Sequence, residues 1–318
     1  MVDNNVLIAK ADLALSSLTS NGGLKPDEVR PFIVLMVTPR VFLRRCRIED
    51  TSSPTLRIPN LRFTGRVFAQ ANSGQALAAG ARSAPTLGQN TADVSRLIRA
   101  EFIIPDEIAE DNVDGEVLLN KIREAAAQAG SKDVEDLVIN GDTTIAPATD
   151  VLLGRLDGLL KKTTVNTLAL GTIVVSKDVW TSIELTMPAE FSSENYQEPM
   201  QHFTSRKARK NYGNYLAARV GAYGDKNIQD SRGYVEHDGV EVVGVPVFPE
   251  TQGVGTNCTS VLHMDANNAH VVFHREIKME TQRDASAGAA KMVMTARVDV
   301  VYENDNAAVL ATQLKVTT

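Results

Sequence analysis

Few side chains in this sequence are spaced as metal ligands are. His270 and His274 stand four positions apart and could form a metal-binding pair, but the residues between them, Val271 to Phe273, are typical of a strand, and no third ligand is evident. Cys46 and Cys258 are far apart and also lack metal-ligand spacing. Two reduced cysteines are the simplest interpretation. The sequence therefore predicts no metal ligands.

Motifs for catalysis or for nucleotide binding are missing as well. The sequence has neither a glycine loop of the Walker type nor a nucleophile elbow of the form Gly-x-Ser-x-Gly. Asn140-Gly141-Asp142 is explained by its turn chemistry alone. We therefore expect no catalytic residue and no bound cofactor, and we do not expect an enzyme.

The charged residues are unevenly distributed. Residues 1–100 hold 13 Lys and Arg against 7 Asp and Glu, whereas residues 101–318 hold 20 against 32, which gives the total of −6. A basic first third and an acidic remainder indicate either contact with nucleic acid or packing between copies of the chain. The overall acidity argues against a simple nucleic-acid coat. The basic charge comes mainly from Arg40, Arg44, Arg45, Arg47, Arg57, Arg62 and Arg66.

The composition is that of a folded protein. The chain has 318 residues, of which 43% are hydrophobic and 5% are aromatic. This length predicts one large domain or two intermingled domains. The longest dense apolar run, Phe32 to Val37, is far shorter than the ~18 residues that a membrane span needs, and nothing resembles a signal peptide.

A long helical pattern organises the middle of the first half. It begins after Asp111 and Asn112, which are good N-cap residues, and apolar residues then recur every three or four positions. Gly130 interrupts the pattern, so two short helices are an alternative to one helix from Val113 to Val138. A single helix would be about 39 Å long.

The first 100 residues lack a core of their own. Residues 1–23 and the segment from Pro26 to Pro39 predict two short helices with little apolar surface. Extended segments are predicted at Thr55 to Ile58 and at Arg62 to Phe68, and the small residues from Gln70 to Asn90 predict a long hairpin-like loop. This loop is either solvated or ordered by a neighbouring subunit, and we favour the second alternative.

The rest of the chain predicts an α+β protein, in which a helix and long antiparallel strands form layers. The last 57 residues are strand-like, and apolar and polar side chains alternate from Lys291 to Tyr302. Val235 to Val247 predicts a hairpin that turns on His237-Asp238-Gly239. Other segments are predicted to be a strand at Arg96 to Ile104, a helix at Val151 to Leu160, a buried strand at Gly171 to Ser176, a short helix around Trp180, and irregular chain at 186–212.

Taken in order, these features resemble the major capsid proteins of tailed bacteriophages, the family with the Hong Kong 97 phage fold. The resemblance covers most of the chain, although residues 186–260 match poorly. The matching segments are Gly23 to Arg47 (GLKPDEVRPFIVLMVTPRVFLRRCR), Arg57 to Pro85, Ala100 to Asn112 (AEFIIPDEIAEDN), Glu135 to Asp142 (EDLVINGD), and Val271 to Val309, which includes Arg297-Val298-Asp299 and Asn306-Ala307.

The resemblance implies a division of the chain and favours one long spine helix. It implies an N-terminal arm at 1–50, an extended loop at 51–100, a peripheral domain with the spine helix and a β-sheet at 101–150 and 261–318, and an axial domain at 151–260. It also implies that the arm and the loop lie across neighbouring subunits. The candidate inter-subunit contacts pair basic Arg57, Arg62 and Arg66 with acidic Glu110, Asp114, Glu116 and Glu124.

The function implied by the resemblance is that of a major capsid protein, which self-assembles through pentamers and hexamers into an icosahedral shell around phage DNA. An encapsulin-type compartment is the nearest alternative, and a soluble α+β enzyme or binding protein is a more distant one. The implied location is the virion, and the host cytoplasm during assembly. The arm begins within about 25 residues of Met1, so we expect a separate scaffolding protein or none; portal and decoration proteins are further expected partners, and DNA contact would be non-specific.

One prediction concerns covalent cross-linking, which some members of this family achieve by an isopeptide bond between a loop lysine and an asparagine. No lysine lies between Lys25 and Lys121, and arginine cannot replace it because its guanidinium stays protonated. In denaturing electrophoresis the assembled protein should therefore run as one band near its 34.4 kDa mass. A ladder of covalent oligomers that survives reduction would contradict this prediction.

Overall fold

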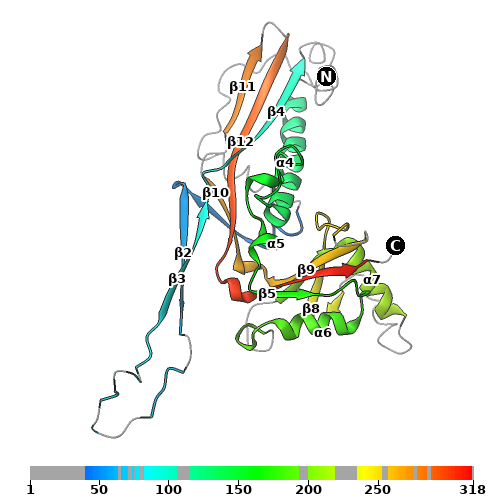
Figure 1. Cartoon of the computed structure of the whole chain (residues 1–318). Coiled ribbons are helices and arrows are strands. Elements are labelled where there is room, and N and C mark those ends of the chain that lie inside the picture. The colour runs from blue at the N-terminus through cyan, green and yellow to red at the C-terminus, as the bar shows by residue number, and fades with distance from the viewer. Residues whose placement is uncertain are drawn as a thin grey trace.

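The computed structural model describes residues 40–63, 66–70, 74, 76–78, 80, 82–105, 115–192, 200–218, 235–252, 257–274, 278–284 and 288–316. The helices predicted within residues 1–39, and the N-cap residues Asp111 and Asn112, lie outside this part of the chain. The described residues form two lobes, each built on one sheet, and a two-stranded hairpin that projects away from both (Figure 1). No helix among them is both long enough and apolar enough to cross a membrane.

The first lobe is built around one long strand, β12 (Ala289–Tyr302). Its second half pairs with β10 (Ala269–His274), and its first half lies between β4 (Leu97–Pro105) and β11 (Lys278–Asp284), always antiparallel. The parallel strand β1 (Arg47–Thr51) extends the sheet beyond β10. The even-numbered side chains of β12 from Met292 to Val300 are buried and the odd-numbered ones up to Arg297 are half-buried, which confirms the predicted alternation.

The helix α4 (Gly115–Asn140) packs beside this sheet as a single element of 26 residues (Figure 1). It continues through Gly130, so the prediction of one spine helix is confirmed and the alternative of two short helices is wrong. The second half of the helix buries Val134, Leu137 and Val138 in the same core as β12. This burial outweighs the cost of about 1 kcal/mol that a glycine imposes on a helix.

The chain after α4 is held by close backbone contacts. The N–H of Gly158 donates to the carbonyl oxygen of Gly141 at 2.8 Å, and the N–H of Asp142 donates to that of Leu153 at 2.9 Å. The helix predicted at Val151 to Leu160 is therefore wrong. The segment instead forms a 3-10 turn, η2 (Leu153–Arg155), and the short helix α5 (Leu159–Lys162). Gly158 allows the backbone to approach the end of α4, and Gly154 allows it to approach Ile145.

The second lobe contains a six-stranded sheet in the order β5-β13-β9-β6-β8-β7. The helices α6 (Lys177–Thr186) and α7 (Arg206–Ala217) pack on it, and Trp180 and Tyr212 are fully buried in its core. The strands are β5 (Asn166–Ala169), β13 (Ala308–Lys315), β9 (Cys258–Asp265), β6 (Met200–Ser205), β8 (Val240–Val245) and β7 (Glu236–His237). Thus β9 and β13 lie in this sheet, although the sequence analysis grouped residues 261–318 with the spine helix.

The structure confirms two expectations in this lobe, the helix around Trp180 and the hairpin at Val235 to Val247, and corrects two others. The described part of residues 186–212 is not irregular throughout, since it contains β6 and most of α7. Polar residues such as Thr204 obscured the strand in the sequence, because their polar groups find partners inside the sheet. Residues 171–176 are not a buried strand, because only one isolated bridge forms there and Ile173 is 53% exposed.

Two adjacent crossings connect the sheets of the two lobes. The 3-10 turn η4 (Ala266–Asn268) leads from β9 to β10, and η5 (Asp305–Ala307) leads from β12 to β13. Asn268 joins the crossings, because its Nδ2 donates to the carbonyl oxygen of Asn304 at 3.0 Å and its Oδ1 accepts from the N–H of Asn304 at 2.8 Å.

The turn at residues 40–46 fastens the described N-terminal end of the chain to both lobes. Phe42 is fully buried, and its N–H donates to Oε1 of Glu135 on α4 at 2.9 Å. Both terminal nitrogens of the Arg45 guanidinium donate to the carboxylate of Glu241 on β8, and Nη2 lies 3.0 Å from Oε1. Oε2 of Glu135 is a buried oxygen without a hydrogen-bond partner among the described residues. Burial therefore raises the pKa of Glu135, although the bond from Phe42 opposes this shift.

The tight contact at Gly158 makes a first structural prediction. A Cβ added there would lie 2.7 Å from both the N atom of Gly141 and the carbonyl oxygen of Ile139, so the backbone would have to shift. Gly158→Ala should therefore lower the free energy of unfolding by about 1–3 kcal/mol. Gly80→Ala is the matched control, since nothing lies within 4 Å of its added Cβ. Urea denaturation of unassembled subunits measures both, and equal stability of the two variants would refute the steric argument.

The buried carboxyl of Glu135 predicts a pH dependence of stability. Its folded-state pKa is raised above the ordinary 4.5, so the folded chain binds the proton more tightly than the unfolded chain does. Stability should consequently fall as pH rises from about 4.5 through the raised pKa. Glu135→Gln keeps an oxygen for the N–H of Phe42 and should flatten this fall. Glu124→Gln, on the exposed side of the same helix, controls for the lost charge. A Glu135→Gln variant with the original pH slope in denaturant titrations would contradict this assignment.

Candidate assembly surface

The projecting hairpin consists of β2 (Thr55–Arg62) and β3 (Thr86–Asp93). The strands are antiparallel, with Thr55 opposite Asp93 and Arg62 opposite Thr86. The predicted hairpin character of this region is confirmed, and the first strand contains the extended segment Thr55 to Ile58. The described residues of the extended segment predicted at Arg62 to Phe68 form no strand beyond Arg62, where β2 ends. The partner of β2 is instead β3, whose residues 86–90 were predicted to belong to the loop.

The base of the hairpin is part of the folded body. Ile58 and Ala92 are buried against Val272 and Val301 of the first lobe in a small apolar cluster. Next to this cluster, the N–H of Asp93 donates to Oδ2 of Asp299 at 2.7 Å. The amides of Asn60 and Asn90 donate to backbone oxygens of Glu303 and Tyr302 at 3.0 and 2.8 Å. These contacts fix the direction in which the hairpin leaves the body.

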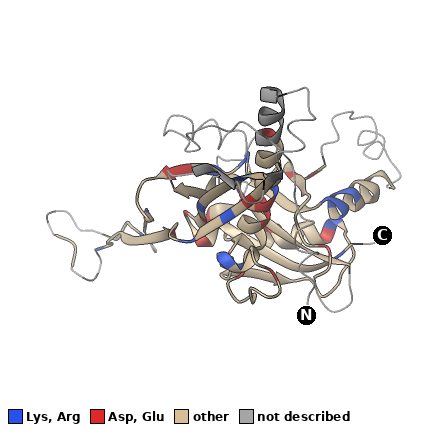
Figure 2. Ribbon diagram, turned by 90° about the horizontal axis from the view of Figure 1, so that it is seen from above, with Lys and Arg blue, Asp and Glu red and all other residues tan. Residues whose placement is uncertain are grey.

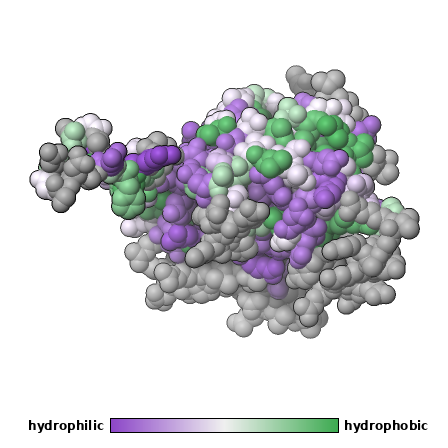
Figure 3. Space-filling view, turned by 90° about the horizontal axis from the view of Figure 1, so that it is seen from below, coloured by the Kyte–Doolittle hydropathy of each residue, from purple (hydrophilic) through white to green (hydrophobic). Residues whose placement is uncertain are grey.

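The outer part of the hairpin presents apolar side chains to solvent. Leu61 is 62% exposed and its cross-strand partner Leu87 is 78% exposed, while Phe68, beyond the end of β2, is 95% exposed. Phe63 and Val67 are each 49% exposed. The space-filling view shows hydrophobic and hydrophilic surface side by side along the hairpin (Figure 3). Apolar groups gathered on a projecting element are typical of a surface that another molecule covers.

The predicted contact arginines lie on this hairpin as far as the structure describes them. Arg57 is exposed on the face of β2 that points away from the buried Ile58, and Arg66 is exposed beyond the strand. Arg62 ends β2, and its side chain lies outside the described part of the structure. Seen from above, acidic and basic residues are interspersed over the described body (Figure 2).

The predicted acidic partners lie elsewhere. Glu124 is exposed on α4, whereas Glu110 and Asp114 fall outside the described residues, as does the side chain of Glu116. The hairpin points away from α4 (Figure 1), so one chain does not bring Arg57 or Arg66 to Glu124. Contact between these groups requires a second copy of the chain.

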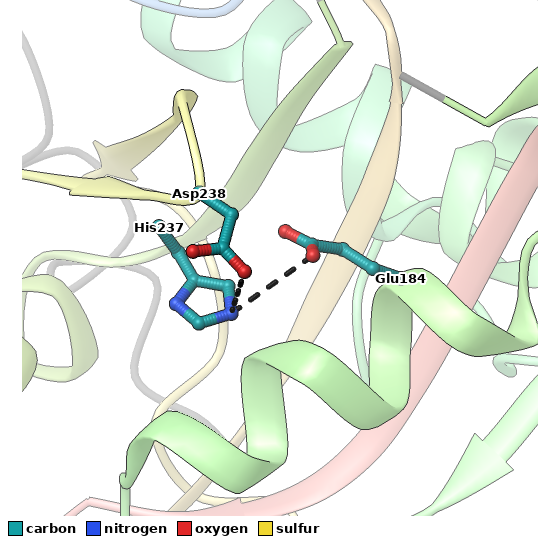
Figure 4. A group of neighbouring side chains, drawn as sticks. All are labelled: Glu184, His237 and Asp238. Atoms are coloured by element: carbon teal, nitrogen blue, oxygen red, sulfur yellow. Dashed lines mark ion pairs between the residues drawn. The ribbon is translucent and has the colours of Figure 1, made fainter. Parts of the chain in front are cut away.

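Sequence reasoning missed a cluster of titratable groups in the second lobe. The spacing of residues along the sequence predicted no metal ligands, but the fold brings a histidine and two carboxylates together. Nε2 of His237 lies 3.9 Å from Oε2 of Glu184 and 3.8 Å from Oδ2 of Asp238 (Figure 4). The adjacent pair His237-Asp238 in a predicted turn was the available signal, but Glu184 is distant in sequence. These three residues are the ones in the described structure that could hold a metal ion.

Burial shifts the pKa values of Glu184 and of the neighbouring His202. It raises the pKa of Glu184 to about 7, with the nearby His237 opposing the shift. It also lowers the pKa of His202, whose Nε2 lies 3.0 Å from Oε1 of Glu184, to about 3. His202 is therefore neutral near pH 7, and its Nε2–H is placed to donate to Glu184. The ring of His263 stacks on that of His202 at 4.3 Å.

Comparisons with known proteins match the chain over nearly its full length. No protein-family model matches it. A curated relative, named "Putative prophage capsid protein YqbE" from Bacillus subtilis (strain 168), is 25% identical over 316 residues, which cover 98% of this chain and 99% of the relative.

Solved structures give the same fold. A chain of the satellite phage P4 procapsid, in a structure that includes the size determination (Sid) protein, has a TM-score of 0.68 at 15% identity and covers 99% of this chain and 96% of its own length. The holo-SrpI encapsulin of Synechococcus elongatus PCC 7942 has a TM-score of 0.58 at 10% identity, with 100% and 97% covered. The resemblance expected from the sequence is thus confirmed, and the chain has the α+β fold of the tailed-phage capsid proteins.

Proposed function

We propose that this chain is a major capsid protein, many copies of which self-assemble into an icosahedral shell that encloses phage DNA. The observation that carries the proposal is the hairpin β2–β3, whose base is fixed to the first lobe while Leu61, Leu87 and Phe68 stay exposed. An element built in this way gains a core only when a neighbouring molecule covers it. The full-length likeness to phage capsid chains supports a second copy of the chain as that neighbour.

The proposed mechanism is geometry repeated over many modest interfaces. An exposed ion pair contributes only about 0–1 kcal/mol, but in a closed shell the same contact recurs in every subunit. We place Arg57, Arg62 and Arg66 of one copy against the acidic residues of a neighbour's spine helix. Those residues are Glu110, Asp114, Glu116 and Glu124.

The lobes also have proposed positions in the shell. The first lobe, with α4 and β12, corresponds to the peripheral part, and the second lobe, with α6 and α7, to the axial part around each capsomer's centre. Residues 1–50 and 51–100 correspond to the arm and the extended loop. In this arrangement the chain has a structural role without catalysis, in the virion and, before that, in the host cytoplasm. A separate scaffolding protein, a portal and a decoration protein are the proposed partners.

An encapsulin-type shell is the second candidate, since the encapsulin chain shares the fold at a TM-score of 0.58. The higher TM-score of 0.68 with the P4 procapsid chain and the prophage origin of the curated relative favour the viral shell. Electron microscopy of the purified protein, expressed with and without its neighbouring genes, tests the proposal. Shells that package DNA support it, shells that enclose a protein cargo favour the encapsulin alternative, and the absence of shells under every condition would reject both.

The hairpin arginines give an assembly prediction. Replacing Arg57, Arg62 and Arg66 together by Ala should leave the subunit folded and lower the yield of shells, because each shell loses these contacts in every subunit. High salt should also lower the yield of shells from the original protein, because it screens the same ion pairs. Sedimentation measures shells against free subunits, and circular dichroism checks the fold.

A matched control removes three positive charges from the second lobe, by Lys177→Ala, Arg206→Ala and Lys210→Ala, all at exposed positions. The hairpin variant should assemble less well than this control. Equal yields from the two triple variants would show that net charge, and not the hairpin contact, controls assembly.

A further inference from the structure

The cluster of Glu184, His237 and Asp238 lies far from the hairpin, at the edge of the sheet in the second lobe. Glu184 is on α6, His237 ends the edge strand β7, and Asp238 is in the turn between β7 and β8. One donor atom from each residue lies within 4.8 Å of the other two. Figure 4 shows both carboxylates directed at the same ring nitrogen of His237.

The spacing of these atoms suits an ion better than direct hydrogen bonds. The separations from Nε2 of His237, 3.9 Å to Glu184 and 3.8 Å to Asp238, are too long for hydrogen bonds. Two ligand atoms bound to one tetrahedral zinc ion lie about 3.4 Å apart, because each is about 2.0–2.1 Å from the metal. A contraction of about 0.5 Å would bring each carboxylate oxygen to that distance from Nε2. The two carboxylate oxygens lie within 4.8 Å of each other, and the exposed side chain of Asp238 can turn to close that separation.

The imidazole is already held in the orientation that metal binding requires. Nδ1 of the buried His237 lies 2.9 Å from the hydroxyl of Tyr212, and donation of Nδ1–H to that oxygen leaves the lone pair of Nε2 facing the carboxylates. Nε2 also contacts the hydroxyl of Thr181 at 3.2 Å. The Thr181 hydroxyl can instead donate to the carbonyl oxygen of Lys177, which lies 3.3 Å away. Its contact with Nε2 can therefore be given up, which leaves Nε2 available to a metal ion.

The carboxylates are positioned by different means. His202, which is fully buried, contacts Oε1 of Glu184 at 3.0 Å and so leaves Oε2 to face His237. Asp238 has a φ of 43° and precedes Gly239 with a φ of 86°, which is the left-handed pair expected in a tight hairpin turn. This turn places Asp238 directly beside His237, with its carboxylate exposed to incoming ions.

We propose that Glu184, His237 and Asp238 bind a divalent transition-metal ion, with zinc as the best match. An imidazole nitrogen together with two carboxylate oxygens suits zinc, whereas magnesium and calcium prefer an all-oxygen set with more ligands. Three protein ligands leave one position for water. The ion would tie α6 to the β7–β8 turn and so fasten the edge of the six-stranded sheet. This role is independent of the shell function proposed above.

The molecule supplies its own comparison site at His270. This buried histidine also lies between two carboxylates, but they contact opposite ring nitrogens: Glu49 is 3.0 Å from Nδ1 and Glu303 is 3.2 Å from Nε2. Both distances are those of hydrogen bonds. One ion cannot be bound by ligands on opposite edges of a ring, so Glu303→Gln removes a carboxylate from a histidine cluster without touching the proposed site.

The test uses the full-length chain, stripped of metal with a chelator and then titrated with zinc chloride by calorimetry. The original protein should bind one equivalent of zinc. Asp238→Asn and Glu184→Gln should weaken binding by about tenfold or more, since even changes behind the ligands cost about 10–100-fold. Glu303→Gln should bind as the original does. Asn tolerates the left-handed turn conformation, so Asp238→Asn should remain folded, which circular dichroism checks.

Cobalt(II) provides a second measurement in the same proteins, because its visible absorption reports the ligands directly. The original protein and Glu303→Gln should give the same cobalt spectrum, and Asp238→Asn should change or lose it. The proposal is overturned if the original protein fails to bind one equivalent of zinc, if Asp238→Asn and Glu184→Gln both bind as tightly as it does, or if Glu303→Gln weakens binding to the same extent.

Discussion

The pairing of one strand, β12, is the constraint on which the other parts of this molecule depend. Its 14 residues join β4 and β11 at one end to β10 at the other, and its buried even-numbered side chains form the floor on which α4 packs. A shift of its register by one residue would turn Met292, Met294 and Val298 to the wrong face and remove the surface that buries the helix. The spine helix depends on packing against this surface, because Gly130 lowers the intrinsic stability of the helix.

The same strand also directs the hairpin. Asp299 accepts the N–H of Asp93, Val301 lies in the cluster beneath Ile58, and the carbonyl oxygen of Tyr302 accepts the amide of Asn90. Lys162 of α5 contacts Asp299 as well, at 3.3 Å. The last residues of β12 therefore unite the first lobe, the hairpin and the segment that follows the spine helix. The hairpin can extend far from the body because its base is fixed at this point.

Sequence reasoning recovered the elements with strong local patterns and missed those defined by distant contacts. The alternation in β12, the turn at His237-Asp238-Gly239 and the periodicity of α4 are local, and each predicted its element. The sequence of β6 resembles polar irregular chain, because His202 and Thr204 are buried only where β8 and β9 flank them. Nothing in the sequence around Gly158 indicates that the end of α4 lies against it. The approach of Glu184 to His237 is likewise a product of the tertiary fold, and the arginines of the hairpin are the part of the candidate surface that composition alone could identify.

The paired crossings η4 and η5 have a consequence for the rigidity of the chain. Both are short turns, and the side chain of Asn268 binds them to each other. The two sheets also share one apolar core, in which Phe203 and Leu262 of the second lobe lie with Leu137 of α4 and Val298 of β12. Rotation of one lobe against the other would have to disturb this core and bend both turns. The angle between the two sheets is therefore a property of the folded subunit, as the angle of a bracket is set by its corner.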